Sequence, residues 1–150
     1  MILEDFHLHT TFSDGKNTPE EMIRAALDMG MKRIGISDHA PTPCGESYCI
    51  ARDRVTEYRE TIGALKEKYR GRIDVLCGIE QDLYSYDPAE GYDYVIGSVH
   101  AFKHGDAYYD VDYSAERLAE VTEQFYGGDY MTMAEDYFAR VAQLAAMRPD

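Results

Sequence analysis

Short apolar runs alternate along the chain with stretches in which apolar residues recur every three or four positions. A short apolar run is typical of a buried strand, and the longer spacing is typical of one face of a helix. Strands are therefore predicted at residues 2–6, 32–37, 73–79 and 94–99, and a helix is predicted at residues 55–69. The apolar face of that helix would consist of Val55, Tyr58, Ile62, Leu65 and Tyr69.

Capping residues predict three further helices. Thr18 followed by Glu21 forms a capping box, which indicates a helix over residues 19–29. Ser114 is expected to cap a helix that ends at a pair of glycines, and a last helix is predicted from about residue 130 to 147. The alternation predicts an α/β fold with about four parallel strands and helices, as an open sheet or as part of a barrel.

The composition narrows the class of protein. The chain has 150 residues, enough for one domain, and a net charge of −13. This charge repels phosphodiesters and anionic lipids, so we expect no nucleic-acid or membrane partner, and no apolar run approaches the roughly 18 residues of a membrane span. Bound cations could still reverse the local charge at a phosphorylated substrate. Three cysteines without a secretory signal favour a cytoplasmic protein.

Histidine and carboxylate side chains follow each predicted strand. After the first come His7, His9 and Asp14; after the second, Asp38 and His39; after the third, Glu80 and Asp82; after the fourth, His100, with His104 just beyond. The C-terminal ends of parallel strands meet at one edge, where active sites are built. We therefore expect these side chains to converge.

The HxH spacing gives this expectation a chemical meaning. Because a strand has a period of two, His7 and His9 would point to one side if the strand continued that far. Imidazoles and carboxylates from neighbouring strands could complete the coordination of Zn²⁺, Mn²⁺ or Fe. The donors suffice for two or three ions.

Four motifs carry a family resemblance: FHLHTTFSDG from Phe6, SDHA from Ser37, GIE from Gly78 and GSVH from Gly97. Together they resemble the polymerase and histidinol phosphatase (PHP) family, and more narrowly its histidinol-phosphate phosphatase branch. The resemblance implies a distorted (β/α)₇ barrel with a trinuclear metal centre that hydrolyses phosphate monoesters.

The resemblance also implies roles for individual residues. Among the metal ligands, His7 and His9 would hold one ion, Asp14 and His39 a second, and His100 a third, with Glu80 bridging two. Asp38 would orient His39. Separately from the resemblance, position near the predicted strand ends makes Glu80, Asp82 and His104 candidates for catalysis, and Arg52, Arg54 and Lys103 candidates for phosphate binding.

The chain also departs from the family pattern. Family members have a further barrel half with a histidine after a fifth strand and a later Asp-x-His, whereas this sequence has no histidine after His104 and ends at Arg148, Pro149 and Asp150. We interpret residues 1–150 as a single PHP domain truncated before the C-terminal barrel half. Such a half barrel exposes strand edges and apolar surface, so we expect a homodimer or a second chain that completes the barrel.

The predicted function is that of a metal-dependent phosphoesterase, converting histidinol phosphate to histidinol in histidine biosynthesis. Two alternatives stay open. One is a PHP-type nuclease or nucleotide phosphoesterase, which would need a basic groove that the acidic composition disfavours. The other is a non-catalytic metal-binding fragment, because an incomplete set of ligands binds ions more weakly.

Overall fold

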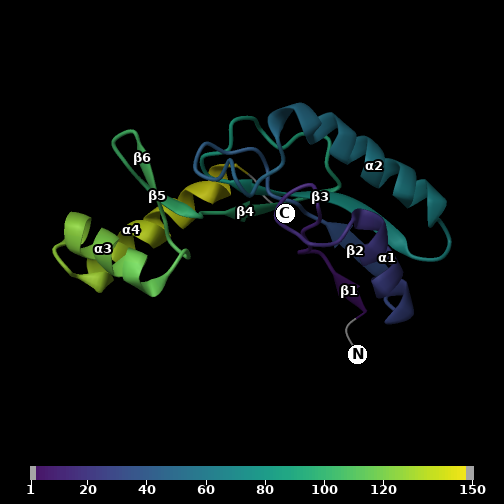
Figure 1. Ribbon diagram of the computed structural model, residues 1–150, viewed down its shortest axis with the longest axis horizontal. Helices are drawn as coiled ribbons and strands as arrows, with labels where there is room; N and C mark the ends of the chain where they lie inside the picture. The colour runs from purple at the N-terminus through teal and green to yellow at the C-terminus, as the bar shows by residue number, and fades with distance from the viewer. Residues whose placement is uncertain (1–2, 148–150) are drawn as a thin grey trace.

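A computed structural model describes residues 3–147 of the chain (Figure 1). Ile2, which the pattern assigns to the first strand, lies outside the described residues, and so do Arg148, Pro149 and Asp150. Figure 1 shows α1 and α2 at one end of the molecule and a β-hairpin with α3 and α4 at the other.

Four parallel strands form the main sheet, in the order β1-β2-β3-β4. Their bounds are β1 Glu4–Asp5, β2 Arg33–Ile36, β3 Asp74–Asp82 and β4 Tyr94–Ser98. The register pairs Ile36 with Cys77, and Gly78 with Tyr94. The predicted α/β fold with parallel strands is thus confirmed, and it has the architecture of part of a (β/α) barrel.

The larger core lies between one face of this sheet and two helices, α1 (Pro19–Asp28) and α2 (Val55–Lys68). Its buried side chains include Ile34 and Ile36 from β2, Val75 and Ile79 from β3, and Ile23, Tyr58 and Ile62 from the helices. Since side chains alternate along a strand, Gly35, Gly78, Glu80 and Asp82 belong to the opposite face. The capping box at the start of α1 is present: Glu21 N–H donates to the Thr18 hydroxyl, and Thr18 N–H donates to the Glu21 carboxylate.

A second, smaller core supports the rest of the chain. It consists of the hairpin β5 (Ala101–His104) and β6 (Ala107–Asp110), helix α3 (Ala115–Tyr126) and helix α4 (Tyr130–Gln143). Phe102, Val121 and Met133 are buried there. Two short 3₁₀ helices, Arg52–Arg54 and Leu144–Ala146, precede α2 and follow α4.

The structure corrects the predicted elements in three places. Residues 101–110 form the β5–β6 hairpin, where the sequence predicts neither strand nor helix, because two four-residue strands closed by a short turn are too brief for a periodicity signal. Strand β3 extends to Asp82, so Glu80 and Asp82 lie within the strand rather than after it. Strand β1 ends at Asp5, so His7 and His9 follow the strand and strand alternation does not direct them.

Exposed apolar side chains gather on α4, where Tyr130, Met131 and Phe138 are each more than half exposed. Strands β1 and β4 are the two edges of the main sheet within residues 3–147. In this same part of the chain, no helix combines the length and the hydropathy that crossing a membrane requires.

Candidate metal centre

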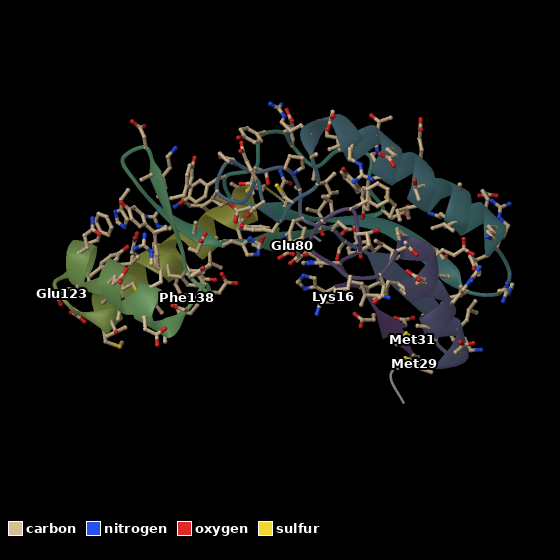
Figure 2. The ribbon with its side chains drawn as sticks, viewed as in Figure 1. Lys16, Met29, Met31, Glu80, Glu123 and Phe138 are labelled. Carbon is tan, nitrogen blue, oxygen red and sulfur yellow. The ribbon has the colours of Figure 1, made fainter. Side chains whose placement is uncertain are left out.

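Glu80 is the hub of the candidate site. Its side chain is only 5% exposed, and it lies near the middle of the molecule in Figure 2. Its Oε2 atom lies 3.1 Å from His7 Nε2 and 2.9 Å from His9 Nε2. The same oxygen lies 3.1 Å from His39 Nδ1, and Oε1 lies 3.3 Å from His100 Nε2. One buried carboxylate therefore faces four imidazoles that come from three separate parts of the sequence.

The segment after β1 is fixed by Asp38, a fully buried carboxylate. The Thr10 N–H donates to Asp38 Oδ1 at 2.7 Å, and the Thr10 hydroxyl donates to Oδ2 at 2.8 Å. The Ser13 hydroxyl donates to Oδ1 at 2.5 Å. Asp38 thus shapes the turn that carries His9 and Asp14, whose Nδ1 and Oδ1 atoms lie 2.9 Å apart.

These contacts revise the role that the resemblance assigns to Asp38. The resemblance implies that it orients His39, but the hydrogen bonds of its carboxylate go to Thr10 and Ser13. His39 is placed instead by its own backbone, which bridges to Glu80 in parallel fashion and accepts a hydrogen bond from Ile50 N–H. Asp38 belongs to the second motif, and its carboxylate therefore holds the backbone and side chains of the first motif in place.

Asp82 holds His100. The His100 N–H donates to Asp82 Oδ2 at 2.8 Å, and the Nδ1 atom of its ring lies 3.1 Å from the same oxygen. Asp82 is buried on the same face of β3 as Glu80, and its Oδ1 also accepts the Tyr84 N–H. A carboxylate bonded to one nitrogen of an imidazole directs the other nitrogen toward an ion. Here that other nitrogen points to Glu80.

The electrostatics of the cluster follow from one carboxylate among several rings. Burial by itself would raise the pKa of Glu80, but hydrogen bonds from His100 and His9 hold it far below its ordinary value. Burial opposes protonation of His100, but Asp82 and Glu80 raise its pKa to about 10. Burial lowers the pKa of His39 to about 4. Glu80 is therefore ionised, and His39 offers a neutral nitrogen at neutral pH.

Three overlapping groups of donors could each hold a cation: His7, His9 and Glu80; His9, Asp14 and His39; and His39, Glu80 and His100. Within each group the donor atoms lie within 4.8 Å of one another. Neutral imidazole and carboxylate donors are those that Zn²⁺, Mn²⁺ and Fe accept. A buried carboxylate with four imidazoles around it has the chemistry of such a centre, so these residues fit divalent ions.

The cluster opens into a cavity of about 480 Å³. All six predicted metal ligands line it: His7, His9, Asp14, His39, Glu80 and His100. The expectation that these side chains converge in space is met. Their assignment as ligands stays a prediction.

Six further residues complete the cavity wall: Cys44, Ser47, Tyr48, Asp110, Asp112 and Tyr113. Sequence reasoning missed them as site residues, because the loop after His39 and the end of β6 reach the cavity only through the fold. The Cys44 thiol donates toward Asp82 Oδ1 at 3.6 Å, and burial raises its pKa to about 11. Burial and the neighbouring Asp112 raise the pKa of Asp110.

The predicted phosphate-binding residues lie away from this wall. Arg52 pairs with Asp87, and Arg54 pairs with Glu57 on α2. Lys103 lies over the Tyr108 ring of its own hairpin. The structure does not bring these three side chains to the six predicted metal ligands.

His104, a predicted catalytic residue, also lies outside the cavity wall. Its ring stacks on Phe125 of α3 with centroids 3.9 Å apart, and its Nε2 atom lies 3.2 Å from the Tyr126 hydroxyl. Burial lowers its pKa. In this position His104 packs the hairpin against α3.

Comparison with known proteins adds independent findings. The family profile described as PHP domain matches residues 5–148. A protein of Deinococcus radiodurans named a probable histidinol-phosphatase is 34% identical over 148 residues, which cover 91% of this chain and 54% of that protein. The chain thus spans about half the length of this relative.

Two solved structures share the fold. A Listeria monocytogenes protein assigned as a histidinol phosphatase superposes with a TM-score of 0.64 at 22% identity, covering 77% of this chain and 51% of that one. The histidinol phosphate phosphatase of Lactococcus lactis, solved with zinc, L-histidinol and phosphate, gives a TM-score of 0.54 at 23% identity, covering 69% and 41%.

Proposed function

Because the chain belongs to the PHP domain family, we propose that it is a metal-dependent phosphoesterase that hydrolyses a small phosphate monoester. The observation that carries the proposal is the arrangement of four imidazoles around the buried Glu80 carboxylate at the floor of an open cavity. We propose His7, His9, Asp14, His39, Glu80 and His100 as the ligands of two or three Zn²⁺, Mn²⁺ or Fe ions.

Such ions supply hydroxide near neutral pH and neutralise the charge on phosphoryl oxygens. The residues of the chain fix the geometry around them. Glu80 brings negative charge to the centre of the cluster, and its low pKa keeps that charge in place. Asp82 directs His100, and Asp38 directs the turn with His9 and Asp14. In this proposal Asp82 acts through His100 and not as an acid or base.

Histidinol phosphate is the substrate we favour. All three of the compared proteins carry the name of a histidinol phosphatase, at 34% identity or less, and one of them was solved with L-histidinol and phosphate. The cavity wall adds support from this chain itself, because Asp110 and Asp112 line it. Carboxylates complement the ammonium group that histidinol phosphate carries and that a nucleotide phosphate lacks.

The remaining parts of the proposal concern the pathway, the cellular location, self-association and the binding of phosphate. The role in histidine biosynthesis and a cytoplasmic location are proposals that rest on the same substrate and on three free thiols. Self-association is proposed because exposed apolar side chains gather on α4. Arg52, Arg54 and Lys103 stay candidates for phosphate binding only if they move, since each now has a partner away from the cavity.

A phosphate-release assay tests the proposal. The 150-residue chain is incubated with Zn²⁺, Mn²⁺ or Fe²⁺ and offered histidinol phosphate, a nucleoside monophosphate or single-stranded DNA, and released phosphate and the length of the DNA strand are measured in parallel. We expect metal-dependent phosphate release from histidinol phosphate that Glu80→Gln abolishes and Glu57→Gln, an exposed carboxylate on α2, retains. Preferred cleavage of DNA would indicate a nuclease, and bound metal without any turnover would indicate a non-catalytic metal-binding module. Either result would contradict the proposal.

A further inference from the structure

The ring of Tyr94 crosses the face of the sheet that carries Glu80. Tyr94 is the first residue of β4 and pairs with Gly78 of β3. A Cβ atom added at Gly78 would overlap with the Tyr94 ring, and one added at Gly35 of β2 would overlap with its hydroxyl end. The ring therefore lies flat over two neighbouring strands, and it can do so because both strands have glycine at the crossing points.

The far end of this ring reaches the segment that carries the first two histidines. The Tyr94 hydroxyl donates a hydrogen bond of 2.6 Å to the backbone carbonyl of Phe6, 88 residues away in sequence. The Phe6 and Tyr94 rings also meet edge to face, with centroids 5.8 Å apart. Burial raises the pKa of Tyr94, so its hydroxyl keeps the proton that it donates.

The contact between Tyr94 and Phe6 lies just beyond the last residue of β1 that pairs with β2. The β1–β2 ladder pairs Glu4 and Asp5 only, so Phe6 and His7 lie beyond its end. The His7 N–H donates only locally, to Asp5 Oδ1 at 3.1 Å. The next backbone anchor to another part of the chain is Leu8, whose N–H donates to the Ser37 hydroxyl and whose carbonyl accepts the Ser37 N–H. Between these two anchors, the Tyr94 hydroxyl is what fixes the Phe6 carbonyl, immediately before His7.

We propose that Tyr94 is a positioning residue that holds the His7 imidazole against Glu80 by fixing the Phe6 backbone, and that Gly35 and Gly78 leave the space its ring needs. The proposal deepens the proposed function, on which the assignment of His7 as a metal ligand rests. The His7 side chain is 53% exposed, so neighbouring side chains confine it little and its place depends on the backbone that carries it. Loss of the hydroxyl should therefore loosen His7 while the rest of the sheet keeps its packing.

Tyr94→Phe tests this, because it removes one oxygen and leaves the ring over the two glycines. Tyr58→Phe is the matched control. Tyr58 is another buried tyrosine, whose hydroxyl bonds the carbonyls of Ile36 and Gly78 from the helix side of the same sheet. Its ring packs on Phe12, beyond the two histidines, rather than on Phe6. Both variants lose buried hydrogen bonds, so both should lower the melting temperature.

Two readouts separate positioning from general destabilisation. The first is amide hydrogen exchange at Leu8 in the metal-free chain, which should accelerate about tenfold in Tyr94→Phe and stay within about twofold of the parent in Tyr58→Phe. The second is the affinity for Co²⁺, followed by its visible absorption, which should fall about tenfold in Tyr94→Phe alone, the size typical when a residue that supports a metal ligand is lost.

The outcomes are distinguishable from those of the proposed function. A parent chain that binds no Co²⁺ would overturn the metal centre and with it the role of Tyr94 toward a ligand. A parent that binds Co²⁺, together with Tyr94→Phe that matches it in both exchange and affinity, would overturn the positioning role alone. Equal loss of affinity in the two variants would also overturn that role, since general destabilisation would then explain it.

Discussion

The Oε2 atom of Glu80 lies 2.9 Å from the Nε2 atom of His9, although 71 residues separate them in the sequence. This contact joins the first motif, which follows an edge strand, to a carboxylate within the longest strand of the sheet. Four imidazoles share that carboxylate, and under the proposed function the cavity that they line would hold the divalent ions and the phosphate monoester.

The buried carboxylate of Asp38 should be important for stability. Its replacement in Asp38→Ala leaves the Thr10 N–H and two hydroxyls without their acceptor, so we expect the free energy of unfolding to fall by about 2–4 kcal/mol. Urea denaturation measures the change. As a control, Asp74→Ala removes an exposed partner of Arg33 and should change stability by no more than about 1 kcal/mol. Equal effects of the two substitutions would contradict the role given to Asp38.

The metal-free chain should lose stability on both sides of neutral pH. The pKa of His100 is raised to about 10 in the folded protein, so its contribution is fully present below about pH 6.5 and is lost as the pH rises toward 10. The pKa of His39 is lowered to about 4, so its contribution is present above about pH 6.5 and is lost as the pH falls toward 4. Melting temperatures measured from pH 4 to 10 in the presence of a chelator test both the alkaline and the acid loss of stability. In His100→Gln the melting temperature should fall less between neutral pH and pH 10 than in the parent. The same fall in both proteins would show that His100 does not cause the alkaline loss of stability.

Asp82 should control the titration of His100. Asp82→Asn removes the charge that its ring faces, so we expect the pKa of His100 to fall, measured in the metal-free chain by NMR of the imidazole protons. His104 provides an internal control because its ring contacts Phe125 and Tyr126 of α3 rather than the carboxylate of Asp82. Metal affinity should also fall about tenfold. A His100 titration identical to that of the parent would refute this coupling.

Asp112 should contribute to substrate choice. The proposed substrate carries an ammonium group, so Asp112→Asn should raise KM for histidinol phosphate about tenfold, the size of one charge-assisted hydrogen bond. The KM for an uncharged aryl phosphate should stay the same. Steady-state kinetics with both substrates check the prediction, and a parallel rise in both KM values would point to a general disturbance of the cavity.

Much of this site could be predicted from the sequence because its main residues follow local rules. Thr18 and Glu21 mark the start of α1, and apolar runs mark the parallel strands whose ends converge, so the neighbourhood of His9, Glu80 and His100 follows from topology.

The rest depends on contacts that no local pattern encodes. Tyr48 and Asp112 reach the cavity because loops fold back over it, and the short β5–β6 hairpin is stabilised by packing of Phe102 on α3 and α4 rather than by its own sequence. The role of Asp38 does not follow from the sequence either, because its neighbour in sequence is His39 while the partners of its carboxylate in space are Thr10 and Ser13.

Elemental analysis of the purified chain tests the central claim most directly. After loading with Zn²⁺, Mn²⁺ or Fe²⁺ and removal of free metal, the parent should retain two or three ions per chain. The double variant His7→Ala/His9→Ala should retain at most one, because only the group of His39, Glu80 and His100 among the three donor groups keeps all its ligands. Circular dichroism confirms that the variant is folded. If the folded double variant keeps the full metal content of the parent, Glu80 and the imidazoles around it are not the metal centre.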